Sequence, residues 1–173
     1  TAQAAPASAA QRADFISRIL PQATAAARRM GVDPDLVVAH AALETGWGRH
    51  VPADGSGQSN NLFGIKASRG GTEAATTEWA DGKASTVQAR FRAYGSIGDC
   101  LDDYANLLCG NPRYAGSLNA GGDATAFASG LARGGYATDP DYVRKLEATV
   151  ASVRDITRGA AFKADGARPI NVT

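Results

Sequence analysis

One dipeptide, Asp81-Gly82, limits the folds open to this chain more than any other feature. It separates two segments, Thr72 to Ala80 and Ala84 to Tyr94, whose side chains alternate with the period of two that is typical of β-strands. An Asp-Gly pair between such segments is a strong signal for a two-residue hairpin turn. Most of the remaining sequence follows helical spacing. We therefore predict an α+β fold that is mostly α, with one β-hairpin inserted after the second helix.

Capping signals and apolar stripes place helices on both sides of the hairpin. A first helix is expected over 11–30, with Pro21 kinking or splitting it. A second helix should start after Asp33 and end at Gly46, followed by a polar loop over 51–61. The later helices are expected from Ser96 to about Cys109, from Asp123 to about Leu131, and from Asp139-Pro140 onward.

The composition is that of one globular domain with tails. The chain has 173 residues, of which 44% are hydrophobic, and this is enough for a packed core. Residues 1–10 are small and include no large apolar side chain, so we predict a flexible linker with further chain before it. Residues 159–173 are polar and broken by Gly166 and Pro169, which indicates a second tail. The predicted domain is therefore 11–158.

Charge and cysteine spacing exclude several classes of protein. The net charge of +1 gives no field for general nucleic-acid binding, and no apolar run approaches the roughly 20 residues of a membrane span. Cys100 and Cys109 point to opposite faces of a predicted helix, roughly 13 Å apart, which is too far for a disulfide. We expect both to be buried free thiols. The absence of CxxC and HxxxH pairs in the sequence argues against a zinc site.

Glu44 is the first candidate catalytic residue. It ends an apolar helix inside the sequence LETGWG. Leu43, Trp47 and the negative end of the helix dipole all disfavour a charged carboxyl, so we expect it to be protonated nearer neutral pH, as a general acid requires. The alternative is a surface glutamate paired with Arg49.

Glu78 is the second candidate, because of the hairpin register. A two-residue turn at Asp81-Gly82 places Glu78 opposite Ser85, on the same face as Val87 and Phe91. That face should turn toward the body of the protein, where a carboxylate needs a cation or a chemical role. Trp79 should point the other way.

His40 lies one helical turn before Glu44, so the two side chains share a face. This pair could bind a metal, but it lacks a third ligand on the same face, although His50 is close in sequence. The alternative is a hydrogen-bonded histidine in the core or at the cleft. Among the aromatic residues, Trp47 and Tyr136 are the two that glycine-rich surroundings favour for a sugar-binding cleft.

Several motifs in one order resemble the peptidoglycan hydrolases of glycoside hydrolase family 73. The resemblance covers about Phe15 to Ile156. Within the family, the residues of these motifs are most similar to those of flagellar members. The motifs are ALETGWGRH, NNLFGIKA at 60–67, TTEWADG at 76–82, FRAY at 91–94, NPRY at 111–114 and GYATDPDY at 135–142.

The resemblance implies a lysozyme-like fold in which a helical lobe and a small β-hairpin lobe flank a glycan-binding cleft. It implies hydrolysis of β-1,4 bonds in peptidoglycan glycan strands, chiefly as an N-acetylglucosaminidase, with Glu44 as general acid and Glu78 as second carboxylate. The expected substrate-binding residues are Trp47, Asn61, Phe63 and Tyr136, and neither a cofactor nor a metal is expected. His40 departs from the family, where glutamine is common.

The same resemblance implies a periplasmic, monomeric domain that opens the cell wall for flagellar rod assembly. Its rod partners would bind a region before Thr1. Four alternatives stay open: an N-acetylmuramidase, a lytic transglycosylase on the same fold, a non-catalytic glycan-binding module, and a zinc enzyme using His40 and His50.

Overall fold

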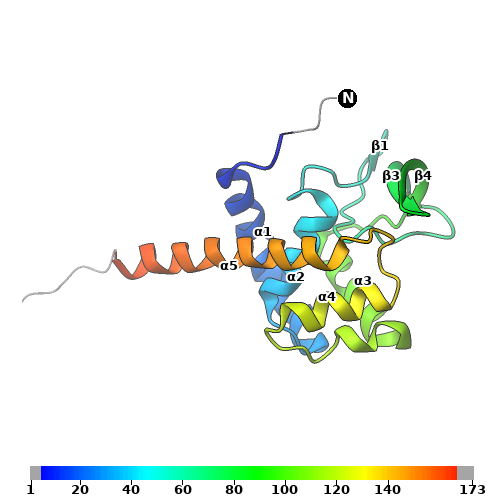
Figure 1. The fold of residues 1–173 in the computed structure, drawn as a ribbon. Helices are drawn as coiled ribbons and strands as arrows, with labels where there is room; N and C mark the ends of the chain where they lie inside the picture. The colour runs from blue at the N-terminus through cyan, green and yellow to red at the C-terminus, as the bar shows by residue number, and fades with distance from the viewer. Residues whose placement is uncertain (1–4, 167–173) are drawn as a thin grey trace, which may run out of the picture.

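The computed structural model describes residues 5–166, and its side chains through residue 160. Figure 1 shows a body of helices with a β-hairpin standing at one side. One helix, α2, runs through the centre of the body and packs against α1 and α5, while α3 packs on α1 and α4 packs on α5. The helices are α1 (Ala9–Met30), α2 (Pro34–Thr45), α3 (Ile97–Gly110), the short 3₁₀ helix η1 (Pro112–Ser117), α4 (Ala124–Arg133) and α5 (Tyr142–Gly166).

The central position of α2 follows from its composition. Its residues 36–42 are all buried, which leaves no polar face in the middle of the helix. A helix that is apolar all round is typical of the inside of a domain. Asp33 is the N-cap as predicted, but its side chain makes no capping hydrogen bond. Gly46 ends the helix in the left-handed conformation at φ 56°, where glycine is favoured.

The first helix is longer than the sequence predicted, and it is continuous. Ser8 and Gln11 form a capping box, so α1 begins at Ala9 rather than Gln11. The prediction that Pro21 splits the helix is wrong. Pro21 lies on the exposed face, while buried residues before and after it, such as Ile19 and Ala23, keep both halves packed on the core.

The hairpin has the predicted turn and register. β3 (Thr72–Ala80) pairs antiparallel with β4 (Lys83–Phe91), and Glu78 lies opposite Ser85. Asp81 and Gly82 both have positive φ, 52° and 73°, which is the geometry of a type I′ turn. The second strand ends at Phe91, three residues earlier than expected, because the next backbone amide, of Arg92, donates to Ile65 O in the helical body.

Two other expectations need correction. The segment 51–61 is not only loop, because β1 (Ala53–Asp54) pairs with β2 (Gly57–Gln58). Cys109 is exposed near the end of α3, whereas Cys100 is buried as predicted, and burial raises the pKa of its thiol to about 11.

The ends of the described chain also differ from the expected domain limits. α5 begins at Tyr142 and its backbone stays helical through Gly166, beyond the predicted limit at 158, and Figure 1 shows its C-terminal part projecting past the body. At the other end, residues 9 and 10 of the predicted N-terminal tail belong to α1 and Ala7 is buried, so the packed structure begins before the predicted limit at 11. Residues 1–4 and 167–173 of the predicted tails lie outside the described residues. None of the helices described between residues 5 and 166 has the length and apolar character needed to cross a membrane.

Candidate active site

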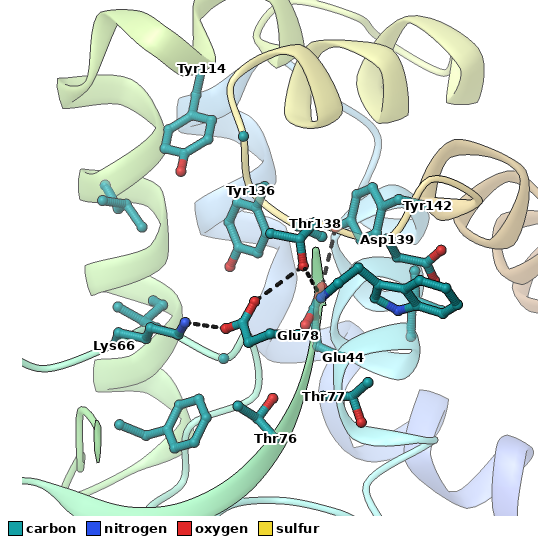
Figure 2. Close-up of a pocket in the computed structure, with 18 of the residues that line it drawn as sticks. Glu44, Lys66, Thr76, Thr77, Glu78, Tyr114, Tyr136, Thr138, Asp139 and Tyr142 are labelled. Carbon is teal, nitrogen blue, oxygen red and sulfur yellow. Dashed lines mark hydrogen bonds and ion pairs between the residues drawn. The ribbon is translucent and has the colours of Figure 1, made fainter. Parts of the chain in front are cut away.

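A cleft of about 800 Å³ separates the hairpin from the helical body. One wall is formed by β3, with Thr76 and Glu78. Trp79, which was expected to point the other way, also lines the cleft. The other wall is formed by the end of α2 with Glu44, the start of α5 with Tyr142, and the loop over 135–139. The structure therefore brings the two predicted carboxylates to the same cleft from two different elements (Figure 2).

Glu44 lies on the last turn of α2, and its side chain contacts residues of the helical body. Its side chain is 21% exposed. Oε1 accepts a hydrogen bond from the Tyr142 hydroxyl at 3.2 Å and lies 3.5 Å from His40 Nε2. Oε2 lies beside Gly64, where an added Cβ would be 3.4 Å away. The alternative pairing with Arg49 is wrong, because the Arg49 guanidinium donates to Gly46 O and Ala5 O instead.

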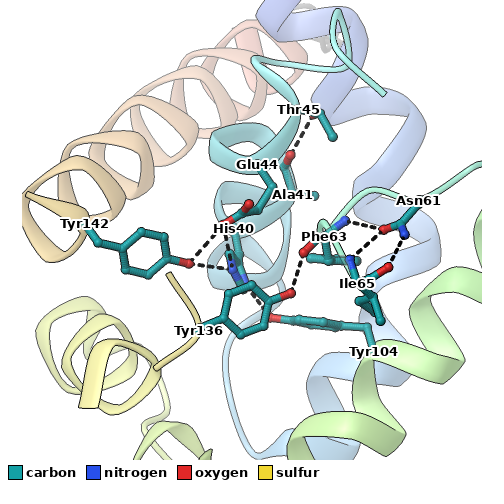
Figure 3. A network of polar contacts seen from close by, with 10 residues as sticks. All are labelled: His40, Ala41, Glu44, Thr45, Asn61, Phe63, Ile65, Tyr104, Tyr136 and Tyr142. Carbon is teal, nitrogen blue, oxygen red and sulfur yellow. Dashed lines mark hydrogen bonds and ion pairs between the residues drawn. The ribbon is translucent and has the colours of Figure 1, made fainter. Parts of the chain in front are cut away.

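Behind Glu44, a chain of buried polar groups runs into the core (Figure 3). His40 is fully buried. Its Nδ1 lies 2.7 Å from the Tyr104 hydroxyl, and its Nε2 lies 2.7 Å from the Tyr142 hydroxyl. Both ring nitrogens are thus engaged with tyrosines, and residues 5–160 contain no cluster of three metal-ligating side chains. The zinc alternative through His40 and His50 is not supported.

Glu78 is held by two partners from different parts of the chain. Lys66 Nζ forms an ion pair with Oε1, and the Thr138 hydroxyl donates to Oε2 at 3.1 Å. The hydrogen bond from Lys66, with help from Thr138, lowers the pKa of the Glu78 carboxyl against the opposing effect of partial burial. Thr138 also accepts a hydrogen bond from the Trp79 amide at 3.0 Å, so it connects the hairpin to the loop across the cleft.

Of the four predicted substrate-binding residues, the structure places only Tyr136 in the lining of the cleft. Its hydroxyl donates to Phe63 O at 2.6 Å, and burial raises its pKa well above the usual value. The ring centroids of Tyr136 and His40 are 4.5 Å apart. Tyr136 therefore forms the floor of the cleft close to Glu44.

The other three residues, Trp47, Asn61 and Phe63, are not in the lining of the cleft. Trp47 packs edge-on against Phe15, with Arg12 5.1 Å above its ring. Asn61 is fully buried, and its amide bonds the backbone of the 61–65 loop and Arg92 O. Phe63 is fully buried and stacks on the Tyr104 ring at 3.7 Å. Their burial and contacts are structural, so we do not carry these three forward as residues that contact a sugar.

Three site residues were missed by sequence reasoning: Lys66, Thr138 and Tyr142. Each lies inside a motif that was noted, NNLFGIKA or GYATDPDY, but their partners are 12, 60 and 98 positions away in the chain. Alternation within the hairpin located Glu78, whereas nothing local pointed to its cation. A search for a basic residue in the motif preceding the hairpin would have found Lys66.

A cleft between a helical body and a hairpin, with one carboxylate on each wall, is the arrangement of a glycoside hydrolase that works by acid–base chemistry. The family described as "Glucosaminidase: Mannosyl-glycoprotein endo-beta-N-acetylglucosaminidase" matches residues 20–155. The chain belongs to this glucosaminidase family of glycoside hydrolases, as its resemblance to glycoside hydrolase family 73 predicted.

Comparison with individual proteins agrees with this assignment. The chain is 43% identical over 139 residues to the peptidoglycan hydrolase FlgJ of Vibrio cholerae. The aligned region covers 78% of this chain but only 42% of that relative. A crystal structure of a peptidoglycan hydrolase mutant from Sphingomonas sp. A1 aligns at TM-score 0.79 and 40% identity, covering 85% of this chain and 99% of that one. The glycoside hydrolase domain of Salmonella typhimurium FlgJ, C-terminally truncated, aligns at TM-score 0.66 and 41% identity, covering 83% and 98%. These neighbours confirm the predicted lysozyme-like fold class.

Proposed function

We propose that this domain hydrolyses β-1,4 glycosidic bonds in the glycan strands of bacterial peptidoglycan, as an endo-β-N-acetylglucosaminidase. The observation that carries the proposal is the pair of carboxylates on opposite walls of one cleft, Glu44 on the central helix and Glu78 on the hairpin. The names of the relatives, peptidoglycan hydrolases, support this substrate class.

In this mechanism Glu44 donates its proton to the glycosidic oxygen as the bond to the anomeric carbon breaks. Glu78 then removes a proton from the attacking water, or supports an intermediate formed by the N-acetyl group of the substrate. Lys66 and Thr138 suit Glu78 to either role, because they keep its carboxylate ionised and aimed across the cleft. Where Glu78 acts as the base, the protein returns to its starting state when Glu44 regains a proton from solvent and Glu78 releases the proton it took from water. Where the N-acetyl group forms the intermediate, the water that opens it gives its proton back to Glu44.

The test is mass spectrometry of borohydride-reduced products after digestion of purified peptidoglycan. Reduced N-acetylglucosamine ends are the expected result, and reduced N-acetylmuramic acid ends would reassign the linkage to a muramidase. If folded wild-type protein creates no new ends, the catalytic proposal is wrong and a glycan-binding module remains.

Substitution of each carboxylate by its amide provides the matched residue test. Glu44→Gln keeps the shape but has no proton to transfer, so we expect activity to fall by roughly 10³-fold or more. Glu78→Gln should lower it by roughly 10²-fold. Circular dichroism and melting temperature serve as controls for folding in both variants.

One observation favours a lytic transglycosylase as the second candidate. Both oxygens of Glu78 already have partners, Lys66 and Thr138, and a transglycosylase needs only one acid/base group, Glu44. The two candidates differ in product and in mutant behaviour. Anhydro ends together with near-wild-type activity of Glu78→Gln would replace the hydrolase with the transglycosylase.

For the cellular role we propose opening of the cell wall during flagellar rod assembly, in the periplasm, by a monomeric domain. The motif resemblance to flagellar members supports this role, and rod proteins would then bind a region preceding residue 1. The chain spans less than half of the curated relative from Vibrio cholerae, so this role concerns the whole protein. Restoring motility to a deletion strain with the wild-type gene, but not with the Glu44→Gln gene, is the expected outcome.

A further inference from the structure

We propose that a one-way chain of hydrogen bonds, from Tyr104 through His40 and Tyr142 to Glu44, determines which oxygen of Glu44 carries the transferable proton. Oε1 receives the last bond of this chain, and Oε2 therefore holds the proton that goes to the glycosidic oxygen. The inference rests on the general-acid role proposed for Glu44, and it makes His40 and Tyr142 positioning residues.

The direction of the chain starts at Tyr104. This residue of α3 is fully buried, and among the described residues its hydroxyl has one hydrogen-bond partner, His40 Nδ1 at 2.7 Å. A hydroxyl has one proton to donate, and leaving a buried donor unpaired is unfavourable. Tyr104 therefore donates to Nδ1, and Nδ1 carries no proton of its own.

The state of the His40 ring follows. A neutral imidazole without a proton on Nδ1 carries it on Nε2. The other tautomer, and the imidazolium, would both direct Nδ1–H at Tyr104 and leave the hydroxyl proton without an acceptor. The ring is fully buried, so among the described residues the two tyrosine hydroxyls are the hydrogen-bond partners of its nitrogens, and aromatic side chains enclose it. These are Phe63, Tyr104, Phe127, Tyr136 and Tyr142.

The last two bonds complete the chain. His40 Nε2–H donates to the Tyr142 oxygen at 2.7 Å, so the Tyr142 proton is directed at Glu44 Oε1, 3.2 Å away. The direct separation between Nε2 and Oε1, 3.5 Å, is too long for a competing hydrogen bond. Oε1 accepts the Tyr142 proton, and the carbonyl oxygen of a carboxylic acid accepts hydrogen bonds better than its hydroxyl oxygen, so Oε1 is the carbonyl oxygen of the protonated acid.

Oε2 is the oxygen that remains for the proton of the acid. It lies next to Gly64, a residue of the cleft lining. The absence of a side chain at Gly64 leaves Oε2 open to a substrate, whereas Oε1 is covered by Tyr142. The hydrogen bonds thus orient Glu44 through Oε1 and leave the proton on Oε2 free to go to the glycosidic oxygen.

The first test reads the tautomer without any measurement of activity. The sequence contains two histidines, so a ¹⁵N-labelled protein with the exposed His50 replaced, His50→Gln, gives signals from His40 alone. The expected spectrum shows a protonated Nε2 and an unprotonated Nδ1 in slow exchange with water. A proton on Nδ1, alone or together with Nε2, would overturn the proposal.

The second test separates positioning from packing by kinetics on a soluble peptidoglycan fragment. Tyr142→Phe removes only the hydroxyl, and we expect kcat to fall roughly tenfold or more with KM within about twofold. Tyr94→Phe is the matched control, because it also removes a tyrosine hydroxyl bound to a carboxylate, Asp103, but outside the cleft lining. An unchanged kcat in Tyr142→Phe would contradict the proposed chain of hydrogen bonds.

Variants of His40 test the direction of the bonds. His40→Gln can accept from Tyr104 through its oxygen and donate to Tyr142 through its nitrogen, so it should recover most of the kcat lost in His40→Leu. Equal kcat in the two variants, with both folded by circular dichroism, would contradict the proposal. If His40→Leu does not fold, the kcat of Tyr142→Phe and the tautomer of His40 test the proposal in its place. An inactive wild type with the expected tautomer would overturn the proposed function and, with it, the role of Oε2, while the bond directions stand.

Discussion

Lys66 lowers the pKa of Glu78, the carboxylate on the hairpin wall of the cleft. It contacts Glu78 from the segment that precedes the hairpin, and the Glu78 side chain is only 30% exposed. A cation beside a carboxylate keeps the carboxylate ionised in acid, which is consistent with the proposed role of Glu78 as a base. Glu44, by contrast, has the Tyr142 hydroxyl and the His40 ring as its polar neighbours. Two carboxylates of one cleft thus have different surroundings, as acid–base catalysis requires.

Replacing Lys66 with Met should shift the acidic limb of the activity profile. Because Lys66 lowers the pKa of Glu78, the wild-type carboxylate stays ionised as pH falls through the ordinary value of 4.5. Without the lysine, Glu78 becomes protonated at a higher pH, so activity should begin to fall earlier on acidification. The measurement is kcat/KM against pH for both proteins, and coincident acidic limbs would contradict this role.

At the scale of elements, the hairpin is attached to the body at both ends. At its base, Ala67 N donates to Arg90 O and Arg92 N donates to Ile65 O. Near its tip, Thr138 binds both the Trp79 amide and the Glu78 carboxylate. Both hydrogen bonds of this upper contact involve the Thr138 hydroxyl, and residues 80–88 around the turn are exposed. The contact spans the cleft that a glycan strand would enter, so its strength bears on how readily the cleft opens.

Thr138→Val should release the upper attachment with little change in volume. We expect faster hydrogen exchange at the Trp79 amide and a loss of kcat, since Glu78 loses one of its two partners. Thr86→Val is the matched control on the exposed strand β4, outside the cleft lining. Unchanged protection of the Trp79 amide in Thr138→Val would show that the hydroxyl does not hold the hairpin.

At the scale of the whole molecule, a second polar cluster joins the end of the hairpin to α3. Arg92 and Tyr94 both bind the carboxylate of Asp103, at 2.8 and 2.6 Å. Burial alone would raise the pKa of Asp103, but the hydrogen bonds from Tyr94 and Arg92 outweigh it and lower the pKa below 3.8. A depressed carboxyl pKa contributes stability above its unfolded value, and this stability is lost as pH falls through the folded value.

The wild type should therefore lose folding stability between about pH 4 and the lower pKa of folded Asp103. Asp103→Asn cannot titrate, so its stability should be lower at neutral pH and should depend less on pH across that window. Urea denaturation at a series of pH values measures both slopes. Parallel curves for the two proteins would contradict the role of this cluster.

The sequence alone determined the features that depend on neighbours in the chain. Asp81-Gly82 determined the turn, and a period of two then determined the register that places Glu78 on the inner face. Gly46 determined where α2 ends, one residue after the turn that holds Glu44. Turn chemistry and capping act over a few residues, so they can be read locally, and the family motifs extended that reading to the fold.

Tertiary structure decided the features that depend on distant contacts. In the folded chain Trp47 packs against Phe15, and Cys109 is exposed near the end of a helix. Asn61 bonds the backbone of its own loop, and Phe63 stacks on Tyr104. The fold also brings Tyr142 to Glu44 across 98 positions. Whether a polar side chain becomes a support, a partner or a reacting group depends on what else is buried with it, and only the packed chain brings those groups together.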